Sequence, residues 1–235
     1  MLDAVLFDWG ETLVHWEWDP GLLEAGHAAG LRALGHEPRP ELTERFVTTY
    51  LPQLDTPGSL ESVDYRAVVV QLLADVGISV DDVGLDRFLE AEHAFWLPAH
   101  QLASTTHALL EVLRSRGLKL GVVSNAFDPP ALLRHDLDQL GITDRIDVAV
   151  FASEVGWRKP HPAIFERALE GLGVPAERTL FVGDSLAVDL AGAAAVGMRT
   201  CQALWFRADD DPAAPEPDFR AFTQMDVLTA VKRLS

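Results

Sequence analysis

From Pro98 onward the sequence alternates between short apolar segments and amphipathic segments with helical periodicity, and this alternation strongly constrains the fold. Strands that alternate with helices form parallel sheets, because each return to the sheet in the same direction needs a crossover connection. Helices then cover both faces of such a sheet. The sequence therefore predicts an α/β fold with a doubly wound, Rossmann-like parallel sheet. The expected strands are 118–123, 146–151, 179–182 and 200–204, and the expected helices are about 103–116, 130–140, 160–172 and 186–196.

One more apolar segment, residues 4–7, lies near the N-terminus and ends at Asp8. A short apolar run followed by a tight turn is typical of a buried strand. Residues 15–99 have a different character, because they carry amphipathic helical segments separated by proline and glycine and show no strand pattern. We therefore expect residues 1–14 and 100–235 to form the α/β core, with a helical-bundle cap domain at residues 15–99 inserted after the first strand.

Charge and composition restrict the partners of the protein. The chain has 36 acidic and 19 basic residues, and its net charge of −17 repels the phosphates of nucleic acids and anionic membranes. We expect neither as a partner, and no apolar run approaches the ~20 residues of a membrane-spanning helix. The N-terminal segment lacks the features of a secretion signal, and a single cysteine, Cys201, fits a reducing compartment. A cytoplasmic protein is expected, either a monomer or a homodimer.

Polar residues follow the expected strands at the points where these strands end. Asp8 follows the first strand, Ser124 and Asn125 follow the second, and Asp184 follows residues 179–182. Lys159 precedes the expected helix at 160–172. The loops at the carboxyl ends of a doubly wound sheet converge on one crevice, which is the usual ligand site of such folds. We therefore expect these side chains to meet there.

The chemistry of these residue types points to phosphoryl transfer. The carboxylate of Asp8 can act as a nucleophile that forms an acyl phosphate, provided that the charge of the electrophile is neutralised. Mg²⁺ prefers oxygen ligands, and Asp8, Asp184 and the backbone carbonyl of Gly10 would supply three. Ser124 and Lys159 would bind the phosphoryl oxygens. A metal ion and a lysine can attract a small anionic substrate in spite of the overall negative charge.

Three neighbouring residues have less certain chemistry, and the sequence leaves their roles open. Asn125 either binds substrate or closes the turn that contains it. Trp9 belongs to an aromatic cluster that either packs between core and cap or forms a wall of the substrate pocket. Asp189 either binds the metal or braces Asp184 or a metal-bound water.

Four motifs, in order along the chain, resemble those of the haloacid dehalogenase-like (HAD) superfamily. Residues 7–13 (FDWGETL) are similar to its D-x-D-x-T box, and residues 122–125 (VVSN) to its second motif. Residues 156–160 (GWRKP) and 182–185 (VGDS), the latter followed by Asp189, are similar to the third and fourth motifs. The resemblance covers essentially the whole chain and is closest to members with a helical, C1-type cap. It implies Mg²⁺, an aspartyl-phosphate intermediate and hydrolysis of a small phosphorylated metabolite, with Asp8, Lys159 and Ser124 as catalytic residues.

The sequence departs from this family pattern at Gly10, where most phosphatases of the family have a second aspartate. That aspartate protonates the leaving group and then activates water, which contributes roughly 10²–10⁴ in rate. Either Glu11, or a carboxylate or histidine from the cap, takes over the proton transfer, or the enzyme is slow or specialised for good leaving groups. Otherwise the reaction differs, as in dehalogenating members, which also lack the second aspartate.

A Mg²⁺-dependent phosphatase is the leading interpretation of the sequence. The first alternative is a haloacid dehalogenase-type hydrolase that works without metal through an ester on the same Asp8. The pair Gly183-Asp184, followed by Asp189, argues against this alternative because it preserves a metal-binding arrangement. The second alternative is a catalytically weak member that binds a phosphorylated ligand, and only Gly10 favours it.

Overall fold

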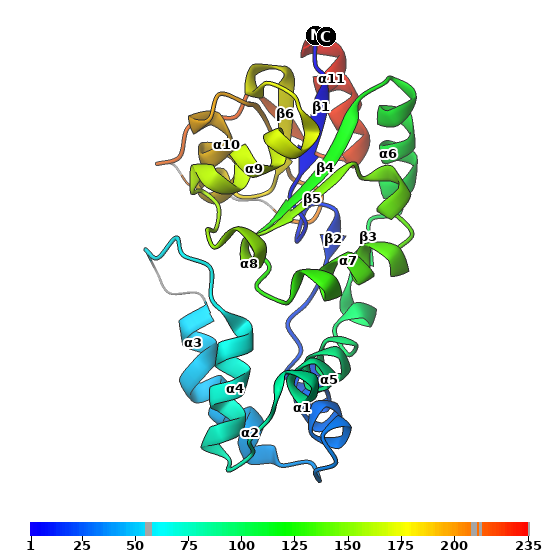
Figure 1. Ribbon diagram of the computed structural model, residues 1–235. Coiled ribbons are helices and arrows are strands. Elements are labelled where there is room, and N and C mark those ends of the chain that lie inside the picture. Colours follow the sequence, from blue (N-terminus) through cyan, green and yellow to red (C-terminus); the bar gives the residue numbers. More distant parts are fainter. Residues whose placement is uncertain (55–57, 208–210, 212, 235) are drawn as a thin grey trace.

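The computed structural model describes residues 1–234 except 55–57, 208–210 and 212. Its core is a six-stranded sheet in the order β5-β4-β1-β6-β7-β8, in which all neighbouring strands are parallel (Figure 1). The predicted α/β fold with a parallel sheet is therefore confirmed. The strands are β1 Ala4–Phe7, β4 Lys119–Ser124, β5 Val148–Phe151, β6 Thr179–Gly183, β7 Arg199–Ala203 and β8 Phe219–Ala221.

Strand β1 lies at the centre of the sheet, between β4 and β6, and all four of its residues are fully buried. Phe7 is paired with Val122 of β4 on one side and with Val182 of β6 on the other. The backbone N–H of Asp8 then donates to the carbonyl of Val182 at 2.9 Å. The three central strands consequently end at one edge, which we call the carboxyl edge of the sheet.

Helices cover both faces of the sheet, because successive residues of a strand point to opposite sides. The face that contains Phe7 packs against α6, α7 and α11, and the face that contains Leu6 packs against α9 and α10 (Figure 1). Each face thus has its own hydrophobic cluster. The helices of the core are α6 Thr106–Ser115, α7 Pro130–Gln139, α8 Ala152–Val155, α9 Pro162–Leu172, α10 Ala191–Ala195 and α11 Val227–Leu234.

Some elements differ from the sequence-based expectation. The helix expected from residue 160 begins at Pro162, because His161 serves as its N-cap and accepts a hydrogen bond from the N–H of Ala163 at 3.2 Å. The helix expected at 186–196 begins with a π-helical segment, Leu186–Leu190, before α10. Strand β8 and helix α11 were not predicted. Three residues with one exposed position are too short for β8 to show a strand period.

The chain leaves the core after β2 (Val14–His15) and returns through β3 (Gln101–Leu102), and these two short strands pair antiparallel. Between them lies a group of helices, here called the helical layer, with its own hydrophobic cluster. Asp19, Asp64 and Asp81 cap the N-termini of α1, α4 and α5 by accepting backbone N–H groups. The helical layer stands beyond the carboxyl edge of the sheet (Figure 1). Its helices are α1 Pro20–Ala33, α2 Pro40–Arg45, the π-helical segment Phe46–Tyr50, α3 Leu51–Leu54, α4 Tyr65–Asp75 and α5 Asp82–His93.

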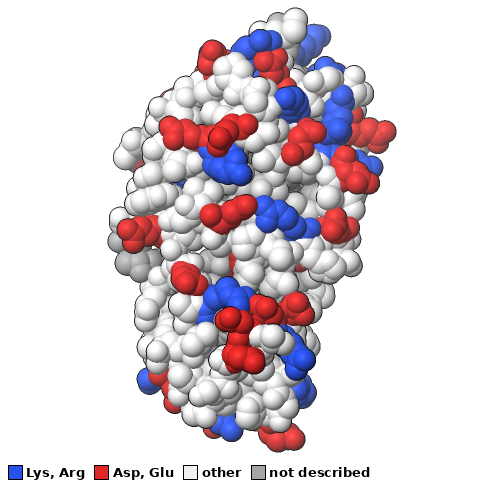
Figure 2. Space-filling model, in the orientation of Figure 1, with Lys and Arg blue, Asp and Glu red and all other residues white. Residues whose placement is uncertain are grey.

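Charged side chains of both signs are scattered over the face of the molecule drawn in Figure 2, without a continuous acidic patch on that face. The net charge of −17 is therefore spread out rather than concentrated there. Among the described residues, every helix is too short or too polar to cross a membrane.

Candidate active site

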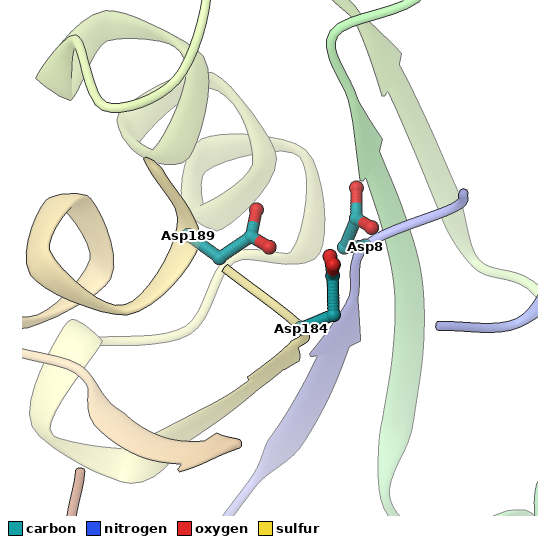
Figure 3. A group of neighbouring side chains, drawn as sticks. All are labelled: Asp8, Asp184 and Asp189. Carbon is teal, nitrogen blue, oxygen red and sulfur yellow. The ribbon is translucent and has the colours of Figure 1, made fainter. Parts of the chain in front are cut away.

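Three carboxylates meet at the carboxyl edge of the sheet. Asp8 follows β1, Asp184 follows β6, and Asp189 lies in the π-helical segment Leu186–Leu190. Their side chains turn toward one another, as Figure 3 shows, and one oxygen atom of each lies within 4.8 Å of the others. All three residues are buried. The structure thus brings together the predicted nucleophile, the predicted metal ligand Asp184 and the less certain Asp189.

The ammonium group of Lys159 lies among these carboxylates. Its Nζ atom forms an ion pair with Asp8 and a second one with Oδ1 of Asp189, at 2.7 Å. Only 5% of Lys159 is exposed, so its charge is screened little by solvent. The structure therefore places Lys159 beside Asp8, where the sequence predicted that the two side chains meet.

Asn125 holds the segment that carries Lys159. Its side-chain oxygen accepts a hydrogen bond from the backbone N–H of Lys159 at 2.7 Å, and its Nδ2 donates to the carbonyl of the same residue at 3.3 Å. Neither of the two roles left open for Asn125 included this contact. The neighbouring Ser124 ends β4, is buried, and accepts a hydrogen bond from the N–H of Ala126 at 3.1 Å through its hydroxyl.

Asp189 is fixed by its own backbone environment. Its Oδ2 atom accepts a hydrogen bond from the N–H of Ser185 at 3.0 Å. A Cβ atom at Gly183 would lie 2.6 Å from the Cβ of Asp189, so glycine is required at this position for the two segments to approach. The hydroxyl of Ser185 accepts from the N–H of Val188 and caps the segment, which leaves the carboxylate of Asp184 free of that role.

Burial governs the protonation of this cluster. Burial raises the pKa of Asp8 to about 7, and the nearby Asp189 and Asp184 add to this effect, while Lys159 opposes it. Burial also raises the pKa of Asp184 to about 6, with a further contribution from Asp189. Burial alone would lower the pKa of Lys159, but Asp189 and Asp8 together raise it above its usual value. The cluster therefore holds more negative charge than Lys159 compensates, and additional positive charge would stabilise it.

The donor set of this cluster fits a hard divalent cation. Asp8, Asp184 and Asp189 offer buried carboxylate oxygens, the ligand type that Mg²⁺ prefers. Mg²⁺ keeps several waters and needs few protein ligands, so a small number of carboxylates at one edge of a sheet suffices.

Comparisons with known proteins agree with this geometry. A family model described as haloacid dehalogenase-like hydrolase matches residues 2–197, most of the chain. The chain belongs to this family. The resemblance that the four motifs indicated is thereby confirmed, and the protein is a HAD-like hydrolase.

Several curated relatives of this hydrolase are named as phosphatases. A ribulose-1,5-bisphosphate 5-phosphatase of Halopiger xanaduensis is 29% identical over 95% of this chain and 92% of its own length. A phosphoglycolate phosphatase of Rhodospirillum rubrum is 33% identical over 84% of this chain and 78% of its own length. The names differ in substrate, so similarity of sequence alone does not specify one.

Solved structures with the same fold include two kinds of chemistry. A HAD phosphatase from Thermococcus onnurineus has a TM-score of 0.68 and 26% identity, covering 98% of each chain. A 2-haloacid dehalogenase from Pseudomonas syringae pv. Tomato has a TM-score of 0.69 and 25% identity, covering 100% of each chain. Because the fold serves both reactions, the site residues of this hydrolase must decide between them.

The residues on either side of Gly10, which follow Asp8, have separate environments in this hydrolase. Gly10 borders the pocket that contains Asp8, and a Cβ atom at Gly10 would lie 3.5 Å from Nε1 of Trp16, an ordinary contact. Glu11, in contrast, forms a hydrogen bond with His15, whose Nδ1 lies 3.1 Å from Oε2 of Glu11. Trp9 is mostly buried in the hydrophobic cluster on one face of the sheet, and it also borders the pocket. The structure therefore brings Trp9 and Gly10 to the pocket and pairs Glu11 with His15.

Arg207 is a site residue that the sequence reasoning missed. Its Nε atom lies 2.5 Å from Oδ2 of Asp184, and it comes from the segment after β7. A signal was present in the sequence, because Arg207 follows the predicted strand 200–204 just as other predicted site residues follow their strands.

A cavity of about 350 Å³ extends from the carboxyl edge of the sheet into the helical layer. Asp8, Gly10 and Ser124 form its wall on the core side, and Asn125 also lines it. The rest of the lining is mostly apolar and aromatic. On the side of the helical layer, the residues that line it include Trp16, Trp18, Phe46, Tyr65, Glu92 and Trp96.

His93 at the end of α5 joins the helical layer to the core. Its Nδ1 lies 3.1 Å from Oδ1 of Asp128, and its Nε2 lies 3.0 Å from Oδ2 of Asp136. Burial lowers the pKa of His93, but the hydrogen bonds and charges of Asp128 and Asp136 outweigh this effect and raise the pKa to about 10. Both ring nitrogens are occupied, so His93 is a structural cation rather than a proton donor for catalysis.

The raised pKa of His93 predicts a pH-dependent stability. A group whose pKa is higher in the folded state stabilises the fold fully below its unfolded value, and this contribution is lost as the pH rises through the folded value. Between about pH 7 and about pH 10, the free energy of unfolding should fall by about 1–3 kcal/mol more than in a His93→Gln variant. Urea denaturation at both pH values measures this difference. An equal loss in the two proteins would contradict the prediction.

Proposed function

We propose that this hydrolase is a Mg²⁺-dependent phosphatase that cleaves small phosphate monoesters through an aspartyl phosphate on Asp8. The observation that carries the proposal is the cluster of Asp8, Asp184 and Asp189 around Lys159 at the carboxyl edge. The phosphatase names of the curated relatives support it. A dehalogenase that works without metal would have no need of Asp184 in this cluster.

Each of these residues has a role that follows from its position. Asp8 attacks the phosphorus atom, the ester bond to the alcohol breaks, and an acyl phosphate forms on the carboxylate. Lys159 and Ser124 bind phosphoryl oxygens, Lys159 compensates their charge, and its ion pair with Asp8 opposes the protonation of that carboxylate. Asn125 acts as a positioning residue through its two hydrogen bonds to Lys159. Water then hydrolyses the acyl phosphate and regenerates Asp8.

Asp8, Asp184 and the backbone carbonyl of Gly10 would hold the Mg²⁺ ion, with Asp189 as a further carboxylate beside it. The ion supplies positive charge that neutralises the phosphoryl group. Arg207 and Lys159 balance part of the negative charge of these carboxylates. We further propose that residues 15–99 act as a cap over residues 1–14 and 100–235 and exclude water from the cavity between them.

Removal of metal tests this proposal directly. Treatment with a chelator should reduce hydrolysis of a general ester such as p-nitrophenyl phosphate to background, and added Mg²⁺ should restore it. An Asp184→Asn variant should need about 10–100-fold more Mg²⁺ for half-maximal rate, because it loses an anionic ligand. The measurement is the initial rate as a function of Mg²⁺ concentration. Hydrolysis that persists in chelator would refute the metal dependence.

The haloacid dehalogenase reaction is the second candidate, because Gly10 replaces the acid/base aspartate and a dehalogenase shares the fold with a TM-score of 0.69. It predicts halide release from 2-haloacids that is insensitive to chelator. Halide release and phosphate release are measured on the same preparation. A third outcome, binding of Mg²⁺ and phosphate with no turnover of any ester, would identify a catalytically weak member that binds a phosphorylated ligand.

A further inference from the structure

The cavity has an unusual balance of charge on the side away from Asp8. Apart from Tyr65, whose raised pKa keeps it neutral, its other ionisable lining residues are Glu92, His93, His100 and Asp128, and no lysine or arginine is among the described residues that line it. The charge of His93 is already compensated by Asp128 and by Asp136 behind it. A second anionic group on a substrate would therefore find acidic neighbours and no uncompensated cation.

Glu92 presents a carboxyl group with one unpaired oxygen to this cavity. Burial raises the pKa of Glu92 to about 7, so a cation on a ligand beside it would favour its ionised form. Glu92 is 1% exposed, and its Oε1 accepts hydrogen bonds from Nε1 of Trp96 at 3.2 Å and from the hydroxyl of Tyr65 at 3.4 Å. Within the described part of the chain, its Oε2 has no hydrogen-bond partner. Buried polar atoms are nearly always paired, so an unpaired oxygen in a binding cavity indicates a donor or cation on the ligand.

Aromatic rings lie beside Glu92 along the cavity wall, with Trp96 linking them to its carboxyl group. The rings of Trp18 and Trp96 are stacked with centroids 5.5 Å apart, and the ring of Trp16 meets Trp96 edge-on at 6.1 Å. Trp18 is 47% exposed and Trp16 is 38% exposed, which is unusual for such large apolar side chains. Faces of tryptophan rings attract cations, and they bind quaternary ammonium groups in particular.

We infer that the cavity binds the alcohol part of a phosphate ester that carries an ammonium group, with Glu92 and the Trp18–Trp96 pair as its contacts. The inference rests on the proposed phosphatase function and names its substrate class, the phosphate monoesters of amino alcohols. The phosphoryl group lies at Asp8, and the ammonium group supplies the cation that the unpaired oxygen of Glu92 lacks. Esters with a carboxylate or a second phosphate in this part of the molecule are disfavoured.

A pair of matched substrates tests this inference. Choline phosphate and 3,3-dimethylbutyl phosphate have nearly the same shape, and only the first carries a positive charge. We expect kcat/KM to be about tenfold or more higher for choline phosphate, a difference of about 1.4 kcal/mol. Ethanolamine phosphate distinguishes a protonated from a quaternary ammonium group, and phosphoglycolate, which carries a carboxylate, should be the poorest substrate.

Two variants assign the preference to these side chains. Glu92→Gln keeps the shape of the side chain but removes its charge. It should reduce the ratio of kcat/KM for choline phosphate to kcat/KM for 3,3-dimethylbutyl phosphate by about fivefold or more. Trp18→Leu should reduce the same ratio. Because Trp18 is half-exposed, this substitution should leave the protein folded, so a lower ratio reports on the contact with the ligand. Glu90→Gln, an exposed position on the same helix α5, serves as the matched control and should leave the ratio unchanged.

Direct binding separates this inference from the proposed function. In an Asp8→Asn variant with Mg²⁺, titration calorimetry should show choline phosphate binding about tenfold more tightly than 3,3-dimethylbutyl phosphate. Equal affinities, or a preference for the neutral ester, would overturn the inference. Absence of turnover of every ester, p-nitrophenyl phosphate included, would refute the phosphatase function, and the binding comparison would still show whether the cavity binds an ammonium group.

Discussion

Replacement of Asp8 by asparagine should reduce phosphatase turnover by about 10⁴-fold or more, which is the effect expected when the only nucleophile is removed. The amide of asparagine has nearly the same shape as the carboxylate but cannot form the acyl phosphate. The fold should persist, because Lys159 keeps its ion pair with Asp189. Burial also disfavours the charged form of Asp8, so its neutral replacement carries no desolvation cost.

The measurement is the initial rate of phosphate release, together with the melting temperature of the variant. Rapid acid quenching of the wild-type enzyme during turnover should also leave a phosphorylated peptide that contains Asp8. An Asp82→Asn variant, which changes an exposed carboxylate at the start of α5, is the control for a general effect of lost charge. Turnover retained in Asp8→Asn would exclude Asp8 as the nucleophile.

Introduction of an aspartate at Gly10 should increase the rate of ester hydrolysis, by a factor that approaches 10² for esters with poor leaving groups. The structure accommodates this change. A Cβ atom at Gly10 makes only an ordinary contact with Trp16, and the backbone of Gly10 lies outside the left-handed region that favours glycine. The new carboxyl group would face the same cavity as Asp8 and could protonate the leaving alcohol.

A Gly10→Asn variant is the matched control, because it adds the same bulk without a group that transfers protons. The measurement is the ratio of kcat for an alkyl phosphate to kcat for p-nitrophenyl phosphate. Since p-nitrophenolate leaves readily without protonation, a new proton donor should raise this ratio. A rate that is unchanged or lower in Gly10→Asp would show that another group already transfers the proton. His100 lines the cavity, and burial lowers its pKa, so it is better suited to accept a proton from the attacking water than to protonate the leaving alcohol.

The sequence predicted the part of the site that depends on chain direction. Asp8, Ser124 and Asp184 each follow an apolar segment, and strands of a parallel sheet all end at the same edge. The convergence of these residues therefore followed from periodicity alone, without knowledge of the strand order. Lys159 was placed through its chemistry and the resemblance of its motif, and the structure has it beside Asp8.

Other parts of the site depend on packing between segments that carry no local signal of each other. Asp189 reaches the cluster because Gly183 allows the π-helical segment to approach β6, and Asn125 bonds the backbone of Lys159 from another loop. Arg207 meets Asp184 across the end of β7. A sequence pattern reports the periodicity of one element, whereas these contacts depend on how several elements are packed.

The sequence by itself determined the fold class and the edge of the sheet at which Asp8, Ser124 and Asp184 lie, and it is the basis for the proposal that Asp8 is the nucleophile. Only the tertiary structure decided which groups line the cavity beside Asp8. In the sequence, Glu92 is one of several charged residues on an amphipathic helix. It is buried because the side of α5 that carries it faces the cavity. Its solvation, and hence its need for a cation, arises from neighbours far away in the chain, so no local pattern could reveal it.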